Sequence, residues 1–319
     1  MKLSIVIPVY NTEPYLDACL ASCLKQDVDL SDYELVIVND GTKDNAMAIA
    51  ERFAKEYPNI TIISQENAGL SAARNAGLVV SKGDYVWFVD SDDCIDKKAL
   101  SLIFNKIEDK PDVICLQAKR SDTYVLRNVF SGNVSNGHDV LLHDFSDWDR
   151  CVPYFVFNRQ FLDNHVLRFY VGIFHEDDEF TPRALFFAEK VSVIDTPMYY
   201  YLVKTDNTIT KSSNPKKSYD NITVAESLSD FKEKHVKAED IKQVFDNHIS
   251  LIINNTLANI KDFDDDTKRD FNRFLGTKKH LFISLRRSNK LKYRLEYVLF
   301  SMSKNYIGVY SFIQKFNKK

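Results

Sequence analysis

The stretch Tyr85-Val-Trp-Phe-Val-Asp-Ser-Asp-Asp93 joins five apolar residues directly to a short run of acids. A continuous apolar run of this length is typical of a strand that is buried on both faces. Like charges at the end of such a strand repel one another, so that a cation or hydrogen bonds must relieve the repulsion. The stretch therefore predicts a buried strand whose carboxyl end carries a charged site.

Strands and helices alternate along the first 115 residues, on both sides of this stretch. Strict alternation predicts an α/β fold in which helices flank a mostly parallel sheet. Right-handed crossovers then bring the loops that follow the strands to one edge of the sheet, where ligands bind. The expected strands are 4–9, 35–38, 60–63, 85–89 and 113–116, and the expected helices are 14–25, 45–57, 71–80 and 97–107.

Residues 120–210 are less regular and richer in aromatic side chains. We expect them to complete the sheet and to build a second wall over the site. After Ser212 to Pro215, where Pro fits the first helical position, the pattern is helical. We therefore divide the chain into a domain at 1–210 and a helical region at 211–319. Within 120–210 we expect short strands at 154–157, 191–194 and 198–201 and a helix at 180–187.

The composition is that of an ordinary globular protein, with 45% hydrophobic and 27% charged residues in 319. No apolar run approaches the ~18 to 20 residues that a membrane-spanning helix needs. The apolar run at 3–9 is too short for the core of a signal peptide, and we expect a cytoplasmic protein.

The charge of the chain is unevenly distributed. Residues 277–319 contain eleven Lys and Arg and one acid, Glu296, whereas the rest holds 31 basic and 44 acidic residues. Their charges of +10 and −13 give the net charge of −3. An apolar stripe with helical spacing runs through this tail, so it could lie on an anionic membrane surface, peripheral to the inner face of the cell membrane. The alternative is a helix packed on the acidic body. We expect no nucleic acid, because no known binding module is present.

Acidic residues follow two of the expected strands. The strand 35–38 leads into Asn39 and Asp40, and the strand 85–89 leads into Asp90, Ser91 and Asp92. Side chains at positions i and i+2 of an extended segment lie on the same side. Two carboxylates in this arrangement suit Mg²⁺ or Mn²⁺, with phosphate oxygens completing the coordination. The sequence lacks the Gly-rich loops of dinucleotide-binding and P-loop proteins and the Gly-x-Ser-x-Gly turn of α/β hydrolases.

Four blocks in this order resemble the family 2 glycosyltransferases, an inverting group with the GT-A fold. The first is Ser4-Ile-Val-Ile-Pro-Val-Tyr-Asn11, and the second is Val36-Ile-Val-Asn-Asp-Gly-Thr-Lys-Asp44. The third spans Glu66 to Gly77 and contains Asn-Ala-Gly-Leu-Ser-Ala-Ala-Arg-Asn, and the fourth is Gly83 to Asp93. The resemblance covers about the first 210 residues and continues more weakly through Phe174-His-Glu-Asp-Asp-Glu-Phe180 and Tyr199-Tyr-Tyr201.

The resemblance implies a role for several residues of these blocks. It places Asp90 and Asp92 on the metal, Mn²⁺ or Mg²⁺, and it makes Asp177 the catalytic base with Glu176 beside it. Arg74 is expected beneath the nucleotide, where it holds these acids in place. The basic residues usual after the Tyr-rich strand are replaced, which leaves Lys204 as a candidate for contact with the diphosphate. The other residues implied in the nucleotide-sugar site are Pro8 and Tyr10 at the base, Asp40 as an acceptor of a hydrogen bond from the base, and Asn67 and Ser91.

These residues fit the chemistry of sugar transfer. A divalent metal stabilises the charge that develops on a departing diphosphate, and a carboxylate can take the proton of an attacking hydroxyl. The resemblance thus implies transfer from a nucleotide diphosphate sugar, with UDP-sugars favoured, to a glycan or lipid-linked acceptor in surface polysaccharide or glycolipid synthesis. Two alternatives remain open at this point. One is a non-catalytic nucleotide-sugar binding module, and the other is a sugar nucleotidyltransferase, which normally needs a Gly-rich basic loop near its N-terminus.

Overall fold

A computed structural model of the chain describes residues 1–120, 126–127, 134–143, 150–202, 214–260 and 262–316. These residues form two compact units. The first contains the described residues up to 202, except 173–175, and the second contains 173–175 and 214–316. The predicted boundary between 210 and 211 falls outside the described residues, so it stays a prediction.

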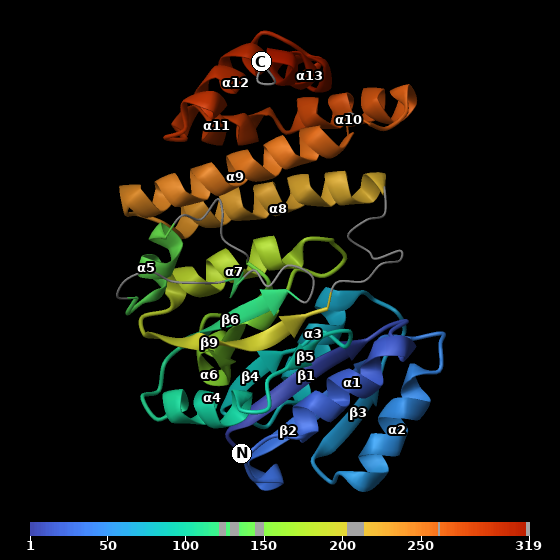
Figure 1. Ribbon diagram of the computed structural model, residues 1–319. Coiled ribbons are helices and arrows are strands. Elements are labelled where there is room, and N and C mark those ends of the chain that lie inside the picture. Colours follow the sequence, from blue (N-terminus) through green and yellow to red (C-terminus); the bar gives the residue numbers. More distant parts are fainter. Residues whose placement is uncertain (121–125, 128–133, 144–149, 203–213, 261, 317–319) are drawn as a thin grey trace. The chain divides into compact units, whose positions relative to one another are not determined.

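The first unit is built on a sheet of nine strands among the described residues (Figure 1). Its order is β3-β2-β1-β4-β8-β6-β9-β5, with β7 paired to β6. The strands β3, β2, β1 and β4 are parallel, as are β6 and β9, whereas β8 runs antiparallel to both of its neighbours. The predicted α/β sheet is confirmed, and its antiparallel pairs come from the less regular half of the domain. The strands are β1 Leu3–Val9, β2 Tyr33–Asn39, β3 Ile60–Ser64, β4 Tyr85–Phe88, β5 Cys94–Ile95, β6 Val113–Arg120, β7 Leu126–Arg127, β8 Phe155–Asn158 and β9 Val191–Tyr201.

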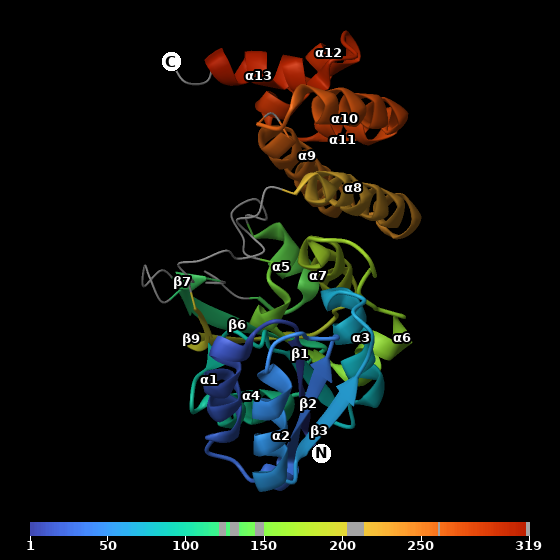
Figure 2. The same ribbon diagram turned by 90° about the vertical axis from the view of Figure 1, so that its right-hand side faces the viewer.

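Helices cover both faces of this sheet, as an α/β fold requires. Figure 2 shows α1, α2 and α4 on one face and α3 and α6 on the other. Short 3₁₀ helices lie at Leu30–Asp32 and Val152–Tyr154. The α-helices of this unit are α1 Glu13–Leu24, α2 Ala46–Glu56, α3 Leu70–Val80, α4 Ala99–Ile107, α5 Gly137–Leu142, α6 Arg159–Asn164 and α7 Glu176–Phe187.

The parallel strands bring the candidate residues to one edge of the sheet. In the centre of the sheet, Val6 of β1 pairs with Val36 of β2 and Phe88 of β4, and all three side chains are buried. Because these strands run in the same direction, the segments that follow them emerge together. The residues that follow β1, β2 and β4 include Tyr10, Asp40 and Asp90.

The strands predicted at 191–194 and 198–201 are a single strand, β9, which corrects the sequence analysis. Its pairing with β6 shifts register between Leu116 and Ala118, where Pro197 faces Gln117. A β-bulge of this kind accommodates a proline that would otherwise interrupt the ladder of hydrogen bonds. Beyond the bulge β9 also pairs with β5, which brings Tyr199 to the segment that follows β4.

An aromatic cluster in the core fixes the position of α7. The ring of Phe180, on α7, stacks on Phe169 at a centroid distance of 4.1 Å and meets Phe157 edge-on at 5.5 Å. Phe88 of β4 contacts Phe169 edge-on at 5.0 Å. Buried aromatic rings contribute large apolar areas and prefer these geometries. The cluster therefore ties the helix that bears the acidic run to the sheet.

The second unit is helical, as predicted. The long helices α8 and α9 are joined by a buried ion pair between Lys232 and Asp246, with 2.5 Å between Nζ and Oδ1. The apolar stripe that we expected along the tail is divided between two helices, because α12 ends at Ser301 and α13 begins at Tyr306. Among the described residues, no helix combines the length and apolar character needed to cross a membrane. The helices are α8 Pro215–His235, α9 Glu239–Ile260, α10 Asp265–Thr277, α11 Ile283–Arg287, α12 Leu291–Ser301 and α13 Tyr306–Phe316, with a 3₁₀ turn at Lys279–Phe282.

Candidate active site

Arg74 lies at the centre of the candidate site. It sits on α3, and the helix packs closely on the sheet at Gly77, where an added Cβ would come within 2.3 Å of Val6. This close approach places the guanidinium of Arg74 inside the domain, with only 1% of the side chain exposed. A buried arginine is unusual unless acids compensate its charge.

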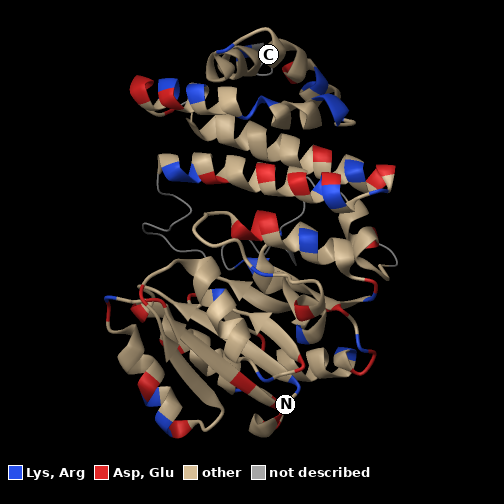
Figure 3. Ribbon diagram, turned by 180° about the vertical axis from the view of Figure 1, so that it is seen from behind, with Lys and Arg blue, Asp and Glu red and all other residues tan. Residues whose placement is uncertain are grey.

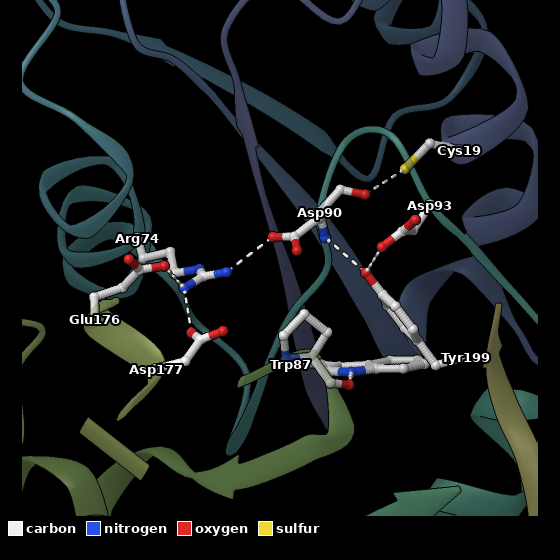
Figure 4. A network of polar contacts seen from close by, with 9 residues as sticks. Cys19, Arg74, Trp87, Asp90, Asp93, Glu176, Asp177 and Tyr199 are labelled. Carbon is white, nitrogen blue, oxygen red and sulfur yellow. Dashed lines mark hydrogen bonds and ion pairs between the residues drawn. The ribbon is translucent and has the colours of Figure 1, made fainter. Parts of the chain in front are cut away.

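Three carboxylates surround this guanidinium (Figure 4). Nη2 donates to Oδ1 of Asp90 at 2.9 Å, while Nη1 donates to Oε1 of Glu176 at 2.9 Å and to Oδ1 of Asp177 at 3.0 Å. The face of Phe169 lies 5.4 Å from the guanidinium carbon, within the range of a cation–π contact. One cation thus joins the acid that follows β4 to the acids at the start of α7.

The carboxylates and the arginine change each other's proton affinity. Burial alone would lower the pKa of Arg74, but Asp177, Asp90 and Glu176 together raise it above its usual value. Burial raises the pKa of Asp177, as do the neighbouring acids Glu176 and Asp90, while Arg74 opposes them. A carboxyl group with a raised pKa is suited to accept a proton near neutral pH.

The four acids at the start of α7 form ion pairs with three different arginines. Glu176 and Asp177 turn to Arg74, whereas Asp178 accepts a hydrogen bond from Nε of Arg150 at 2.6 Å. Glu179 is paired with Arg183, one turn further along the same helix. Acids are also favoured in the first turn of a helix, where backbone N–H groups lack partners. The run is therefore a set of directed contacts and not a uniformly solvated face.

The residues that follow β4 fit a divalent cation. Carboxylate oxygens of Asp90, Asp92 and Asp93 all lie within 4.8 Å of one another. Oxygen donors are what Mg²⁺ and Mn²⁺ prefer. Asp93 already accepts hydrogen bonds from the hydroxyl of Tyr199 at 2.6 Å and from the backbone of Leu202 at 2.9 Å. The cluster thus contains Asp90 and Asp92, the two acids of the predicted metal site, together with Asp93.

Asp93 and Tyr199 had no role in the sequence analysis, although they hold the acidic segment in place. Burial raises the pKa of Asp93 to about 7. The hydroxyl of Tyr199 also accepts a hydrogen bond from the backbone N–H of Asp90 at 3.3 Å, and its ring lies 6.4 Å from that of Trp87. The third acid of the run and the Tyr-rich stretch were the indications in the sequence, but the pairing of β9 with β5, which brings them together, is not visible there.

The carboxylate of Asp40 is turned toward the segment that leads into α3. It is 3% exposed, and it accepts hydrogen bonds from Gln65, from the side chain of Asn67 and from the backbone of Ala68 and Gly69. Asn67 also donates to the backbone carbonyl of Asp40 at 3.0 Å. These contacts order the connection between β3 and the helix that bears Arg74. A contact of Asp40 with a nucleotide base stays a prediction.

Three of the remaining predicted residues, Pro8, Tyr10 and Ser91, lie along the same edge. Pro8 is buried in β1 opposite Val38, and Tyr10 after it is 39% exposed. Ser91 is buried between Asp90 and Asp92. Lys204 lies outside the described residues. The structure thus brings Arg74 into contact with Asp90, Glu176 and Asp177, and Asp40 into contact with Asn67.

Comparison with known proteins agrees with this arrangement. The model of the family described as glycosyl transferase family 2 matches residues 4–165. EpsH of Bacillus subtilis, whose name assigns it to the glycosyltransferases, is 30% identical over 273 residues, which cover 78% of this chain and 74% of EpsH. The poly(ribitol-phosphate) beta-glucosyltransferase of Bacillus spizizenii is 35% identical over 211 residues, or 65% of this chain and 33% of that larger protein.

Among solved structures, residues 1–349 of TarS from S. aureus, in complex with UDP-GlcNAc, have a similar fold. The TM-score is 0.81 at 21% sequence identity, and the match covers 99% of this chain and 92% of the TarS chain. At this level of identity the likeness concerns the fold. It confirms the predicted GT-A architecture, including the helical region that follows the sheet.

Proposed function

The chain belongs to glycosyltransferase family 2, and we propose that it transfers a sugar, with inversion, from a nucleotide diphosphate sugar to an acceptor hydroxyl. The observation that carries this proposal is the guanidinium of Arg74. It contacts Asp90, which belongs to the proposed metal site, as well as Asp177, the proposed base. The two groups that such a transfer needs are therefore held by one buried side chain.

Asp177 is the proposed general base. An inverting transfer needs one carboxylate that accepts the proton of the acceptor hydroxyl as this attacks the sugar, and it needs no protein nucleophile. The side chain of Asp177 is 26% exposed, so a hydroxyl can reach it. Burial raises the pKa of Asp177. Arg74 acts in the opposite direction, because it favours the ionised carboxylate, which is the form that accepts the proton. Glu176, with 11% of its side chain exposed, is less accessible.

Asp90 and Asp92 are the proposed ligands of Mn²⁺ or Mg²⁺. When bound, such a cation stabilises negative charge on the diphosphate leaving group. Asp93 helps to position these two residues, because the hydrogen bonds that it accepts from Tyr199 and Leu202 fix the end of the acidic segment. Tyr10 is proposed to stack on the base, and its 39% exposure leaves the ring accessible.

The donor and the acceptor are proposed from the relatives. The bound UDP-GlcNAc in TarS favours a UDP-sugar as donor. The name of the Bacillus spizizenii relative favours a hydroxyl of a polymer such as poly(ribitol phosphate) as acceptor, and the glycan or lipid-linked acceptor implied by the family resemblance stays part of the proposal. We accordingly propose a role in the synthesis of a cell-surface polysaccharide. Asn67, Ser91 and Lys204 remain candidates for contact with the donor.

A donor panel tests this proposal. The purified chain is heated with UDP-glucose, UDP-GlcNAc, UDP-galactose and GDP-mannose, each with Mn²⁺ and with a chelator, and the melting temperature is recorded. We expect one UDP-sugar to raise the melting temperature, and Mn²⁺ to enlarge the shift. The preferred donor is then incubated with poly(ribitol phosphate), and the anomeric configuration of any product is determined by NMR.

The possible outcomes separate the parts of the proposal. A product with the opposite anomeric configuration to the donor supports inversion, whereas retention contradicts it. An unchanged donor shift in the chelator contradicts the metal site. Donor binding without transfer to any acceptor or to water would favour the non-catalytic binding module.

A further inference from the structure

Helix α12 carries apolar side chains on two opposite faces. One face is buried in the helical unit, where Tyr293 is 5% exposed and Phe300 is 1% exposed. The other face follows the positions i, i+4, i+7, i+8 and i+11, which form one stripe about 100° wide on a helix. Its residues are Leu291 (69% exposed), Leu295 (58%), Val298 (51%) and Leu299 (37%), continued by Met302 (80%) directly after the helix, and we call these five the α12 stripe.

Basic side chains border this stripe on both sides. Lys292 and Arg294 flank it on the helix, and Lys290 and Lys304 lie near its two ends. The side chain of Lys292 is 48% exposed, although it lies 4.0 Å from Glu296. Figure 3, which shows the molecule from behind, has a concentration of Lys and Arg around α11 and α12. Glu296, the only acid of 277–319, is 1% exposed and accepts a hydrogen bond from the side chain of Asn254 on α9.

We propose that the α12 stripe lies in the interface of an anionic lipid membrane. An exposed apolar stripe with a cation on each side is the pattern of a helix that inserts its apolar face between lipid head groups. Lys and Arg side chains beside such a face can extend their charged ends to the lipid phosphates. Because the stripe has cations on both sides and no exposed acid of its own helix, its charge complements an anionic surface. This narrows the membrane contact expected for 277–319 to one face of α12, and it does not depend on the reaction proposed above.

A second copy of the chain fits the α12 stripe less well. In a symmetric pair the same surface meets itself, so that the flanking Lys292 and Arg294 of one copy would approach those of the other. Like charges at close range oppose such a pair. An anionic membrane removes this repulsion, because it supplies the negative charge that α12 does not expose.

Sedimentation with lipid vesicles tests the proposal on the full chain. The vesicles contain phosphatidylcholine alone, or equal parts of phosphatidylcholine and phosphatidylglycerol, at low and at high salt. We expect the chain to sediment with the anionic vesicles at low salt and to remain in solution with the neutral vesicles. High salt is expected to release it, because salt screens the attraction between exposed charges and the surface.

Two double variants, each with its own control, locate the contact. Lys292→Gln with Arg294→Gln is expected to weaken binding by roughly 25-fold, because each basic residue near an anionic surface contributes about fivefold. Leu295→Gln with Met302→Gln is expected to weaken it about tenfold or more, since it removes apolar contact with the lipid. The matched controls are Lys25→Gln with Lys55→Gln for the charge and Val79→Gln, at a position 76% exposed, for the apolar contact. Both controls should bind like the unmodified chain.

Several results would overturn the proposal. The first is that the unmodified chain stays in solution with anionic vesicles at low salt. The second is that both α12 variants bind as tightly as their controls, which would place the contact elsewhere. The third combines two observations: the unmodified chain does not bind vesicles, and light scattering shows that it is a stable dimer. If Leu295→Gln with Met302→Gln dissociates this dimer, the stripe is assigned to a second copy. Circular dichroism spectra identical to that of the unmodified chain exclude unfolding as the cause of lost binding.

Discussion

Nη1 of Arg74 donates a hydrogen bond to Oδ1 of Asp177 at 3.0 Å, across 103 residues of sequence. The bond joins the helix that follows β3 to the first turn of α7. Because Arg74 is almost fully buried, its charge is screened little by water, and its effect on the carboxylate is correspondingly strong. This bond holds the proposed base in a fixed orientation and counteracts the rise in its pKa that burial causes.

Asp177→Asn is expected to lower the rate of sugar transfer by about 10²–10⁴-fold, because the amide keeps the shape of the side chain but accepts no proton. The dissociation constant for the donor should change little. Transfer of a labelled sugar and donor titration by calorimetry measure the two quantities. Asp178→Asn is the control for loss of a charge in the same acidic run, because this neighbour accepts a hydrogen bond from Arg150.

Glu176→Gln distinguishes the two acids that share Nη1 of Arg74. If Asp177 is the base, Glu176→Gln should reduce transfer less than Asp177→Asn does. A larger loss in Glu176→Gln would assign the proton transfer to Glu176. Turnover close to that of the unmodified enzyme in Asp177→Asn would exclude Asp177.

Asp92→Asn is expected to abolish the part of UDP binding that depends on Mn²⁺, because it removes one of the two proposed carboxylate ligands. Calorimetric titration of UDP with Mn²⁺ and with a chelator measures this part. Asp84→Asn is the matched control, since it removes the same charge from the exposed residue at the other end of β4. An equal Mn²⁺ effect in Asp92→Asn and in the control would remove Asp92 from the metal site.

Arg74→Met is expected to reduce the free energy of unfolding by about 3 kcal/mol, because it leaves three carboxylates without their common cation. Breaking a buried ion pair typically costs about 3–5 kcal/mol, and the lower value applies because Asp90 and Asp177 are partly exposed. Denaturant unfolding measures the loss. The control is Arg150→Met, which removes the ion pair between Arg150 and Asp178.

The same substitution has a consequence for the pH dependence of transfer. Arg74 lowers the pKa of Asp177, so its removal lets that pKa rise further. The base is then protonated up to a higher pH, and the acidic limb of the profile of kcat/KM against pH should move upward. An unmoved acidic limb in a folded Arg74→Met enzyme would show that Arg74 does not control the proton affinity of the base.

Glu296→Gln is expected to flatten the pH dependence of stability. Burial raises the pKa of Glu296, against smaller effects of Asn254 and Lys292. The folded protein therefore retains a proton that the unfolded chain releases near its ordinary pKa of 4.5, so this residue destabilises the fold progressively as the pH rises from there to the folded pKa. Melting temperatures across this range should fall less in Glu296→Gln than in the control Glu239→Gln, whose acid is 85% exposed. Parallel curves would contradict the raised pKa.

The sequence alone determined the α/β class, the strands of the parallel half and the acids at their carboxyl ends. These features depend on local patterns, because an apolar run specifies a buried strand and a parallel connection specifies the edge at which its loop emerges. The sheet order and the single strand β9 could not be predicted in this way. The shift of register at Pro197 depends on β6, which is far from it in the sequence.

Only the tertiary structure decided which acid meets which cation. The sequence places Arg74 on a helix and Glu176 and Asp177 in an acidic run, but their contact depends on the packing of α3 at Gly77 and of α7 at Phe180. The same holds for Asp93, whose partner Tyr199 comes from a strand 106 residues away. In the tail, the apolar spacing predicted one stripe that includes Leu295 and Met302. The fold left these two side chains exposed and buried Tyr293 and Phe300, which were not part of the prediction. Periodicity shows which side chains share a face of a helix, but what covers that face is settled by long-range packing.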